Sequence, residues 1–180
     1  GRSVAAIAGD SIKPSLLELG GSDAFIVMPS ADLGKAVKTA VTARIQNSGQ
    51  SCIAGKRFFV HADIYDDFAK RFTTAFDALK VGDPMKADTD VGPLATLAIR
   101  DELADQVERS LKGGAERLTK ERTVPGNGAW IAPQILADAH SGTPSTDEEM
   151  FGPVANLWKV SNLDDAITRA NRSVFGLGSV

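Results

Sequence analysis

The chain has a single cysteine among its 180 residues, Cys52, which ends the segment Asn-Ser-Gly-Gln-Ser-Cys at residues 47–52. A cysteine thiolate can attack a carbonyl carbon, and small neighbours such as Gly49 allow backbone to pack closely around a bound substrate. A lone cysteine is nevertheless more often a small, buried, apolar residue. This segment by itself therefore leaves both a catalytic and a structural role open for Cys52.

Two carboxylates stand in segments that could serve such a thiol. Glu18 lies in Leu-Glu-Leu-Gly-Gly at residues 17–21, and Glu149 opens Glu-Met-Phe-Gly-Pro at residues 149–153. A carboxylate close to a cysteine can activate the water that hydrolyses an acyl-thiol intermediate. Taken alone, Glu18 is more typical of a structural ion pair, and Glu149 of a solvated loop.

The composition is that of an ordinary globular protein, with 43% hydrophobic and 24% charged residues. The net charge of −3 offers no basic surface, so we expect no nucleic-acid partner. No apolar run approaches the roughly 18 residues that span a bilayer, so we expect no membrane span. One cysteine cannot form an internal disulfide, which fits a cytoplasmic protein. His61 and His140 have no second ligand at metal-binding spacing, and no metal site is expected.

Apolar runs alternate with amphipathic stretches along the chain. Strands are predicted at residues 14–19, 24–28, 56–61, 115–118, 131–136 and 154–160. Helices are predicted at residues 3–9, from 33 to 45 behind Asp32, from 64 to 79 behind Asp63, at 96–112 and at 163–171. This alternation favours an α/β fold around a largely parallel sheet. In such sheets strand ends and the loops after helices meet at one face, so Glu18 and Cys52 are predicted to share a site.

Other side chains are expected to be purely structural. The aromatic stripe of Phe68, Phe72 and Phe76 is predicted to pack in the core. Residues 141–146 are predicted to form a polar loop. The helix at 96–112 is predicted to carry a solvated charged face with no part in a site, formed by Asp101, Glu102, Asp105, Glu108 and Arg109.

The segments at 17–21, 47–52 and 149–153 together resemble the aldehyde dehydrogenase superfamily in order and spacing. The resemblance continues through residues 82–84, 92–93, 132–133 and 175–177, and it covers essentially the whole chain. Within the superfamily the chain is most similar to bacterial succinate-semialdehyde dehydrogenases. The resemblance implies a truncated enzyme. Residues 1–21 would end the coenzyme-binding domain, and residues 22–180 would belong to the three-layer catalytic domain.

The resemblance also implies a role for each matching residue. Cys52 would be the nucleophile, forming an acyl thioester, and its backbone N–H would supply half of the oxyanion hole. Glu18 would activate the hydrolytic water. Four residues would contact the NAD or NADP cofactor: Glu149 at the nicotinamide ribose, Phe151 and Leu19 beside the nicotinamide ring, and Gly1 as the last glycine of a cofactor turn.

The remaining parts of such an enzyme lie outside the sequence. They include the phosphate-binding turn and the asparagine that completes the oxyanion hole, so the fragment is expected to be inactive as a dehydrogenase. The full-length protein would be a homodimer or homotetramer acting on a small aldehyde, with succinate semialdehyde favoured. Gln46 stands where some succinate-semialdehyde enzymes have the arginine that holds the substrate carboxylate.

Two other functions stay open at this stage. The first is a CoA-acylating or hydrolytic relative that uses the same thiol, against which Glu18 argues because the acylating branch tends to lack this base. The second is a non-enzymatic scaffold relative, against which the presence of both Cys52 and Glu18 argues.

Overall fold

The computed structural model describes all 180 residues, and its centre is a five-stranded sheet. The strand order is β1-β2-β5-β4-β3. The first four strands in this order are parallel, and β3 joins β4 antiparallel. The strands are β1 (Asp23–Val27), β2 (Gly55–His61), β3 (Glu116–Arg117), β4 (Gln134–Ala137) and β5 (Val154–Val160).

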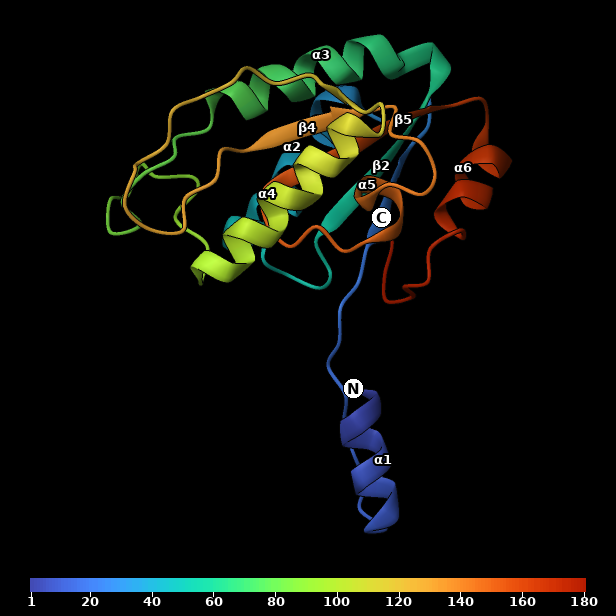
Figure 1. Cartoon of the computed structure of the whole chain (residues 1–180). Helices are drawn as coiled ribbons and strands as arrows, with labels where there is room; N and C mark the ends of the chain where they lie inside the picture. The colour runs from blue at the N-terminus through green and yellow to red at the C-terminus, as the bar shows by residue number, and fades with distance from the viewer.

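Helices cover both faces of this sheet, as Figure 1 shows. Along β2, Phe58 and Val60 face one hydrophobic core while Phe59 faces the other, because successive side chains of a strand alternate. The first core lies under α2 (Leu33–Ile45) and α3 (Ala62–Ala78), and the second under α4 (Leu97–Lys112) and α6 (Leu163–Ala170). The expected three-layer α/β domain around a largely parallel sheet is therefore confirmed.

The aromatic stripe of α3 packs as predicted. Phe68, Phe72 and Phe76 are completely buried, with ring centroids 5.3 Å apart for the first pair and 4.8 Å for the second. Helix α3 begins one residue before Asp63, because His61 is the residue that caps it: its Nδ1 accepts from the Asp63 N–H. The other predicted cap, Asp32 of α2, does accept from the Lys35 N–H.

Helix α1 (Arg2–Asp10) stands apart from the sheet, and an extended segment joins it to the rest of the chain (Figure 1). The prediction of a buried strand at residues 14–19 is wrong, since this segment pairs with no strand and Leu16 is 90% exposed. The edge of β1 is already occupied: Val180 exchanges backbone hydrogen bonds with Ala24 and Ile26. The division into two domains at residue 21 stays a prediction.

Smaller differences concern the second half of the chain. The strand predicted at 131–136 starts later, at Gln134, because β4 forms only where it pairs with β5. The loop predicted at 141–146 contains a one-turn helix, α5 (Pro144–Asp147), which has proline at its first position. None of the helices combines the length and the apolar character needed to cross a bilayer.

One edge of the sheet gathers the segments that the sequence singled out. The strands β1, β2 and β5 are neighbours and run in parallel, so the loops that lead into them meet at the same edge. These loops hold residues 17–22, 50–54 and 149–153. The site therefore lies at the amino ends of the strands, whereas most open parallel sheets bind ligands at the carboxyl ends.

Candidate active site

A groove of about 860 Å³ opens at this edge of the sheet. Its lining includes Glu18 and Leu19 from the segment before β1, Cys52 from the loop before β2, and Glu149 and Phe151 from the loop before β5. Cys52 is partly exposed and forms no disulfide. The structure therefore brings together five of the six residues that the sequence proposed for the site.

Gly1 is the sixth residue, and it does not line the groove. It lies against the side chain of Leu19: a Cβ built on Gly1 would stand 2.9 Å from Leu19 Cδ2. The chain thus places Gly1 one residue away from the groove, behind a side chain that does line it.

The backbone before Cys52 adopts an unusual conformation. Asn47, Ser48 and Gly49 have φ values of 54°, 53° and 78°, three consecutive left-handed residues. The turn is closed on itself, because Asn47 Nδ2 donates to the Gln50 carbonyl at 2.9 Å and Gln50 Nε2 donates to the Asn47 carbonyl at 3.2 Å. A short 3₁₀ turn, η1 (Gln46–Gly49), thereby ends α2 and redirects the chain toward Cys52.

Arg44 fixes this turn by hydrogen bonds to backbone carbonyls, a role that was not predicted from the sequence. Its guanidinium is completely buried and donates to the carbonyls of Gly49 (2.6 Å), Gly55 (3.2 Å) and Gly152. Burial lowers the pKa of Arg44 to about 9, and the charge of Glu149 opposes that shift. The group therefore remains charged at neutral pH and links the loops before β2 and β5.

Lys56 is a second buried cation that sequence reasoning missed. Its side chain is 1% exposed, and Nζ lies 3.3 Å from Glu149 Oε1. The same Nζ donates to the carbonyls of Ser51 at 2.6 Å and Cys52 at 3.1 Å. Burial lowers the pKa of Lys56 and nearby Arg44 lowers it further, while Glu149 raises it.

Glu149 is fixed by two partners. Besides Lys56, its Oε1 accepts from the backbone N–H of Gly21 at 3.1 Å. The glycines of that segment are required by space: a Cβ on Gly20 would collide with Glu149 Oε2, and one on Gly21 would stand 2.5 Å from the Cys52 carbonyl oxygen. The two adjacent glycines let three segments approach within contact distance.

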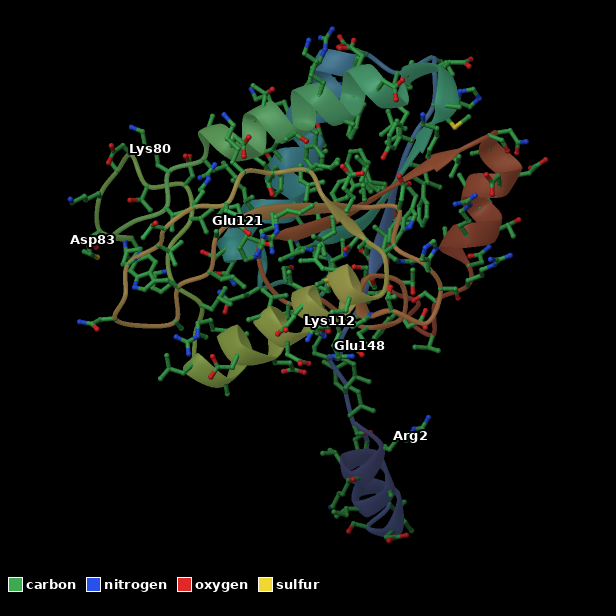
Figure 2. All side chains as sticks on the ribbon, turned by 45° about the horizontal axis from the view of Figure 1, so that its top comes forward. Arg2, Lys80, Asp83, Lys112, Glu121 and Glu148 are labelled. Carbon is green, nitrogen blue, oxygen red and sulfur yellow. The ribbon has the colours of Figure 1, made fainter.

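The neighbouring Glu148 is bound by α4, which corrects the prediction that the charged face of this helix has no part in a site. Arg109 donates to both carboxylate oxygens of Glu148, at 2.8 and 3.0 Å, and Gln106 donates to Glu148 and to the Glu149 carbonyl. Figure 2 shows Glu148 beside the C-terminal part of α4. Hydrogen bonds, chiefly from Arg109, hold the pKa of Glu148 below its usual value. A second residue of α4, Glu102, lines the groove itself.

The lining of the groove suits the nicotinamide end of a dinucleotide cofactor but not its phosphates. Leu19, Phe151 and Phe175 offer apolar surface for a flat ring, and the carboxylate of Glu149 can accept from ribose hydroxyls. No lysine or arginine lines the groove, whereas its carboxylates include Glu18 and Glu102. These residues suit the nicotinamide and ribose of such a cofactor, and they offer no positive charge to bind its phosphates.

A second hollow, of about 560 Å³, adjoins the same loop. Gln50 lines both cavities, whereas Gln46 lines only this second one. The turn before Cys52 therefore separates the groove from this second hollow. Gln46, expected from the resemblance to stand where some succinate-semialdehyde enzymes have an arginine, lines the hollow that does not contain Cys52.

Comparison with known proteins shows what the chain as a whole is similar to. The model of the aldehyde dehydrogenase family matches residues 1–180. A succinate-semialdehyde dehydrogenase [NADP(+)] of Mycobacterium avium (strain 104) is 56% identical over 179 residues, which is 99% of this chain and 38% of that protein. The solved succinic semialdehyde dehydrogenase of Streptococcus pyogenes in complex with NADP+ superposes with a TM-score of 0.94 at 37% identity, covering 99% of this chain and 39% of that one.

Another solved relative is the lactaldehyde dehydrogenase of Escherichia coli, with a TM-score of 0.94, 37% identity, and coverage of 99% of this chain and 38% of that one. The chain thus spans about two fifths of the length of the relatives it matches, as the 38% and 39% coverages state.

Proposed function

The chain belongs to the aldehyde dehydrogenase family, and from this premise we propose that it carries the thiol and the base of an enzyme that oxidises an aldehyde to its carboxylate through a Cys52 thioester. The observation that carries the proposal is the groove in which Cys52 and Glu18 lie together with Glu149 and Phe151. A nucleophile and a carboxylate in one groove supply the two side chains that acylation and hydrolysis need.

The chemistry of the chain's own residues begins at Cys52. Its thiolate attacks the aldehyde carbon, a carbon–sulfur bond forms, and the carbonyl oxygen becomes an oxyanion to which the Cys52 backbone N–H donates. A bound nicotinamide cofactor supplies the hydride acceptor for the oxidation. Glu18 then takes a proton from water, whose oxygen attacks the thioester carbonyl and releases the carboxylate and the free thiol.

Four residues would hold that cofactor. Glu149 would accept from its ribose hydroxyls, Phe151 and Leu19 would pack beside the nicotinamide ring, and Gly1 would support Leu19, against whose side chain it lies. The names of the Mycobacterium avium and Streptococcus pyogenes relatives favour NADP, and NAD is the alternative. The phosphates need partners from outside this groove, because no basic residue lines it.

Succinate semialdehyde is the proposed substrate, supported by the names of those two relatives. Gln46 offers an amide where an arginine would offer a charge, so the substrate carboxylate would need another partner in the full-length enzyme. We expect that enzyme to be a cytoplasmic homodimer or homotetramer.

A CoA-acylating relative and a non-enzymatic scaffold are the competing functions. The position of Glu18 in the groove with Cys52 favours hydrolysis, since an acylating enzyme transfers its acyl group to a thiol and needs no activated water. Formation of acyl-CoA by the full-length protein would support the first competitor. Absence of any acyl-enzyme, whatever the aldehyde, would support the second.

The experiment that tests the proposal measures turnover of succinate semialdehyde by the full-length protein with NADP and with NAD. Cys52→Ala is expected to abolish turnover. Glu18→Gln is expected to release one equivalent of reduced cofactor and then stall as an acyl-enzyme. The isolated chain of 180 residues is expected to be inactive with either cofactor. Sustained turnover by Cys52→Ala would refute the proposed mechanism.

A further inference from the structure

The clearest unexplained feature of the site is a lysine that points at the backbone of the proposed nucleophile. Nζ of Lys56 donates to the Ser51 carbonyl at 2.6 Å, to the Cys52 carbonyl at 3.1 Å, and lies 3.3 Å from Glu149 Oε1. We propose that Lys56 is a positioning residue that sets the direction of the Cys52 N–H, the oxyanion donor, by holding the Ser51–Cys52 peptide. The inference rests on the proposed function of Cys52.

The geometry of the peptide bond links these atoms. The carbonyl of Ser51 and the N–H of Cys52 belong to the same peptide group, which is planar, and all peptides of the chain are trans. In a trans peptide the C=O and the N–H point in opposite directions. A cation that fixes the Ser51 oxygen on one side therefore fixes the Cys52 N–H on the other side.

The N–H of Cys52 is available for this purpose. The chain provides no hydrogen-bond acceptor for it, although the peptide's own carbonyl accepts twice, from Lys56 Nζ and from the Ala54 N–H at 3.2 Å. Withdrawal of electron density by a cationic donor at the C=O also makes the N–H of the same peptide a stronger donor. Lys56 would thus both orient and polarise the group that meets the oxyanion.

Lys56 is itself held rigidly, as a positioning residue must be. It stands at the start of β2, its carbonyl accepts from Asn156 Nδ2 at 3.3 Å, and its side chain is 1% exposed. The ion pair with Glu149 supplies the opposite charge that a buried ammonium requires. The same lysine therefore ties the backbone at Cys52 to the carboxylate proposed to bind the cofactor ribose.

The test compares two reactions of Cys52 in the full-length protein, neither of which uses a cofactor. In the first, the thiolate attacks p-nitrophenyl acetate: the sulfur–carbon bond forms, a tetrahedral oxyanion develops, and p-nitrophenolate leaves an acetylated Cys52. In the second, the thiolate displaces iodide from iodoacetamide, and no oxyanion forms. Both are measured at the same near-neutral pH, and the acylation rate is divided by the alkylation rate so that the fraction of Cys52 present as thiolate cancels.

Lys56→Met is expected to slow the acylation about 10- to 100-fold, a part of what loss of a whole oxyanion donor costs. Its alkylation rate should stay within about threefold of wild type, because displacement of iodide needs no such donor. Lys56→Arg, which keeps the charge and the donors, should recover most of the acylation rate. Lys159→Met is the matched control. It removes an exposed lysine at the carboxyl end of β5 that pairs with Asp66, whereas the loop with Glu149 leads into the amino end of this strand.

Acylation by Lys56→Met at the wild-type rate, or an equal loss of both reactions, would overturn the inference. If Lys56→Met does not fold, Lys56→Gln takes its place with the same two criteria, and the melting temperature of each variant identifies those that fold. The Cys52→Ala variant separates the two proposals. Dehydrogenase turnover by Cys52→Ala refutes the proposed function. If Cys52→Ala is inactive and Lys56→Met is acylated at the wild-type rate, only the role of Lys56 is refuted.

Discussion

The carboxylate of Glu149 accepts a hydrogen bond from the backbone N–H of Gly21, a residue 128 positions earlier in the chain, at 3.1 Å. This contact joins the segment that carries Glu18 and Leu19 to the loop that carries Phe151. It is possible only because β1 and β5 both flank β2, so that the loops leading into them share an edge of the sheet. The formation of the site therefore depends on the order of the strands in the sheet.

The first prediction concerns this carboxylate. Glu149→Gln in the full-length protein keeps an oxygen for the Gly21 N–H but removes the charge that pairs with Lys56 and that is proposed to bind the cofactor ribose. We expect the KM for NADP to rise about tenfold, since one charge-assisted hydrogen bond contributes about 1.5 kcal/mol. Steady-state kinetics with varied NADP would measure it. Glu121→Gln, an exposed carboxylate labelled in Figure 2, should leave this KM unchanged; an unchanged KM in both variants would remove Glu149 from the cofactor site.

The second prediction concerns the backbone before Cys52. Gly49 has φ of 78°, and a Cβ there would collide with the Gly152 peptide. Gly49→Ala should lower the free energy of unfolding by about 3 kcal/mol, from left-handed strain and overpacking together. Gly126→Ala is the control, because nothing lies within 4 Å of its Cβ. Denaturant unfolding curves measure both, and equal stability of the two variants would contradict this account of the turn.

The third prediction is a pH dependence. Because the pKa of Glu148 is lowered by Arg109, the pair stabilises the folded state above the ordinary carboxyl value of 4.5, and this contribution is lost as the pH falls through the lowered value. Arg109→Met should therefore lower the melting temperature by about 1–3 °C at neutral pH, a small shift because the pair is partly exposed. The difference from wild type should shrink as the pH falls below 4.5 and disappear once Glu148 is protonated in the folded state as well.

A control for the effect of Arg109→Met on the site lies one turn along the same helix. Lys112→Met removes an exposed ion pair with Glu108, where the two groups are 2.6 Å apart, and it leaves Glu148 untouched. It should leave the kinetics of the full-length enzyme unchanged, whereas Arg109→Met should also raise the KM for the cofactor, because Glu148 adjoins Glu149. Identical kinetics for the two variants would show that α4 does not position the loop before β5.

The fourth prediction concerns the second hollow. Gln46 lines it, and Gln50 connects it to the groove with the thiol. If the substrate tail reaches this hollow, Gln46→Arg should lower the KM for succinate semialdehyde about three- to tenfold and leave the KM for butanal unchanged, because the guanidinium pairs only with a carboxylate. Gln46→Leu provides the neutral comparison. An equal effect of Gln46→Arg on both aldehydes would place the carboxylate elsewhere.

Most residues of the groove could be predicted from the sequence, because three segments occur together in a recognisable order and spacing, although each segment alone left a structural role open. A lone cysteine after a glycine-containing turn, a glutamate before two glycines and a glutamate before Phe-Gly-Pro are visible without coordinates. The α/β pattern predicted that Glu18 and Cys52 share a site, whereas Glu149 was placed with them only by the resemblance of the three segments to one superfamily. What the pattern could not supply was a strand's partner: residues 14–19 look like a buried strand, yet the place beside β1 is filled by Val180.

The two buried cations were missed for a different reason. Charged residues in a sequence are normally solvated, and only the fold determines which are surrounded by carbonyls. A signal did exist for both: Arg44 continues the buried face of α2 after Val37 and Ala40, and Lys56 is the second residue of β2, whose next four residues are buried. A basic residue on an otherwise apolar face is a sign that backbone oxygens converge there.

The position of β5 in the sheet bears on the order in which the chain can fold during synthesis. It is the last strand in sequence, yet it lies between β2 and β4 at the centre of the sheet. Until Val154–Val160 has left the ribosome, β2 lacks one neighbour and Glu149 has no fixed place. Cys52 therefore begins as an ordinary thiol on a nascent chain, and the surroundings that would make it a catalyst are completed only by a late, long-range pairing step, which is the slow kind in folding kinetics.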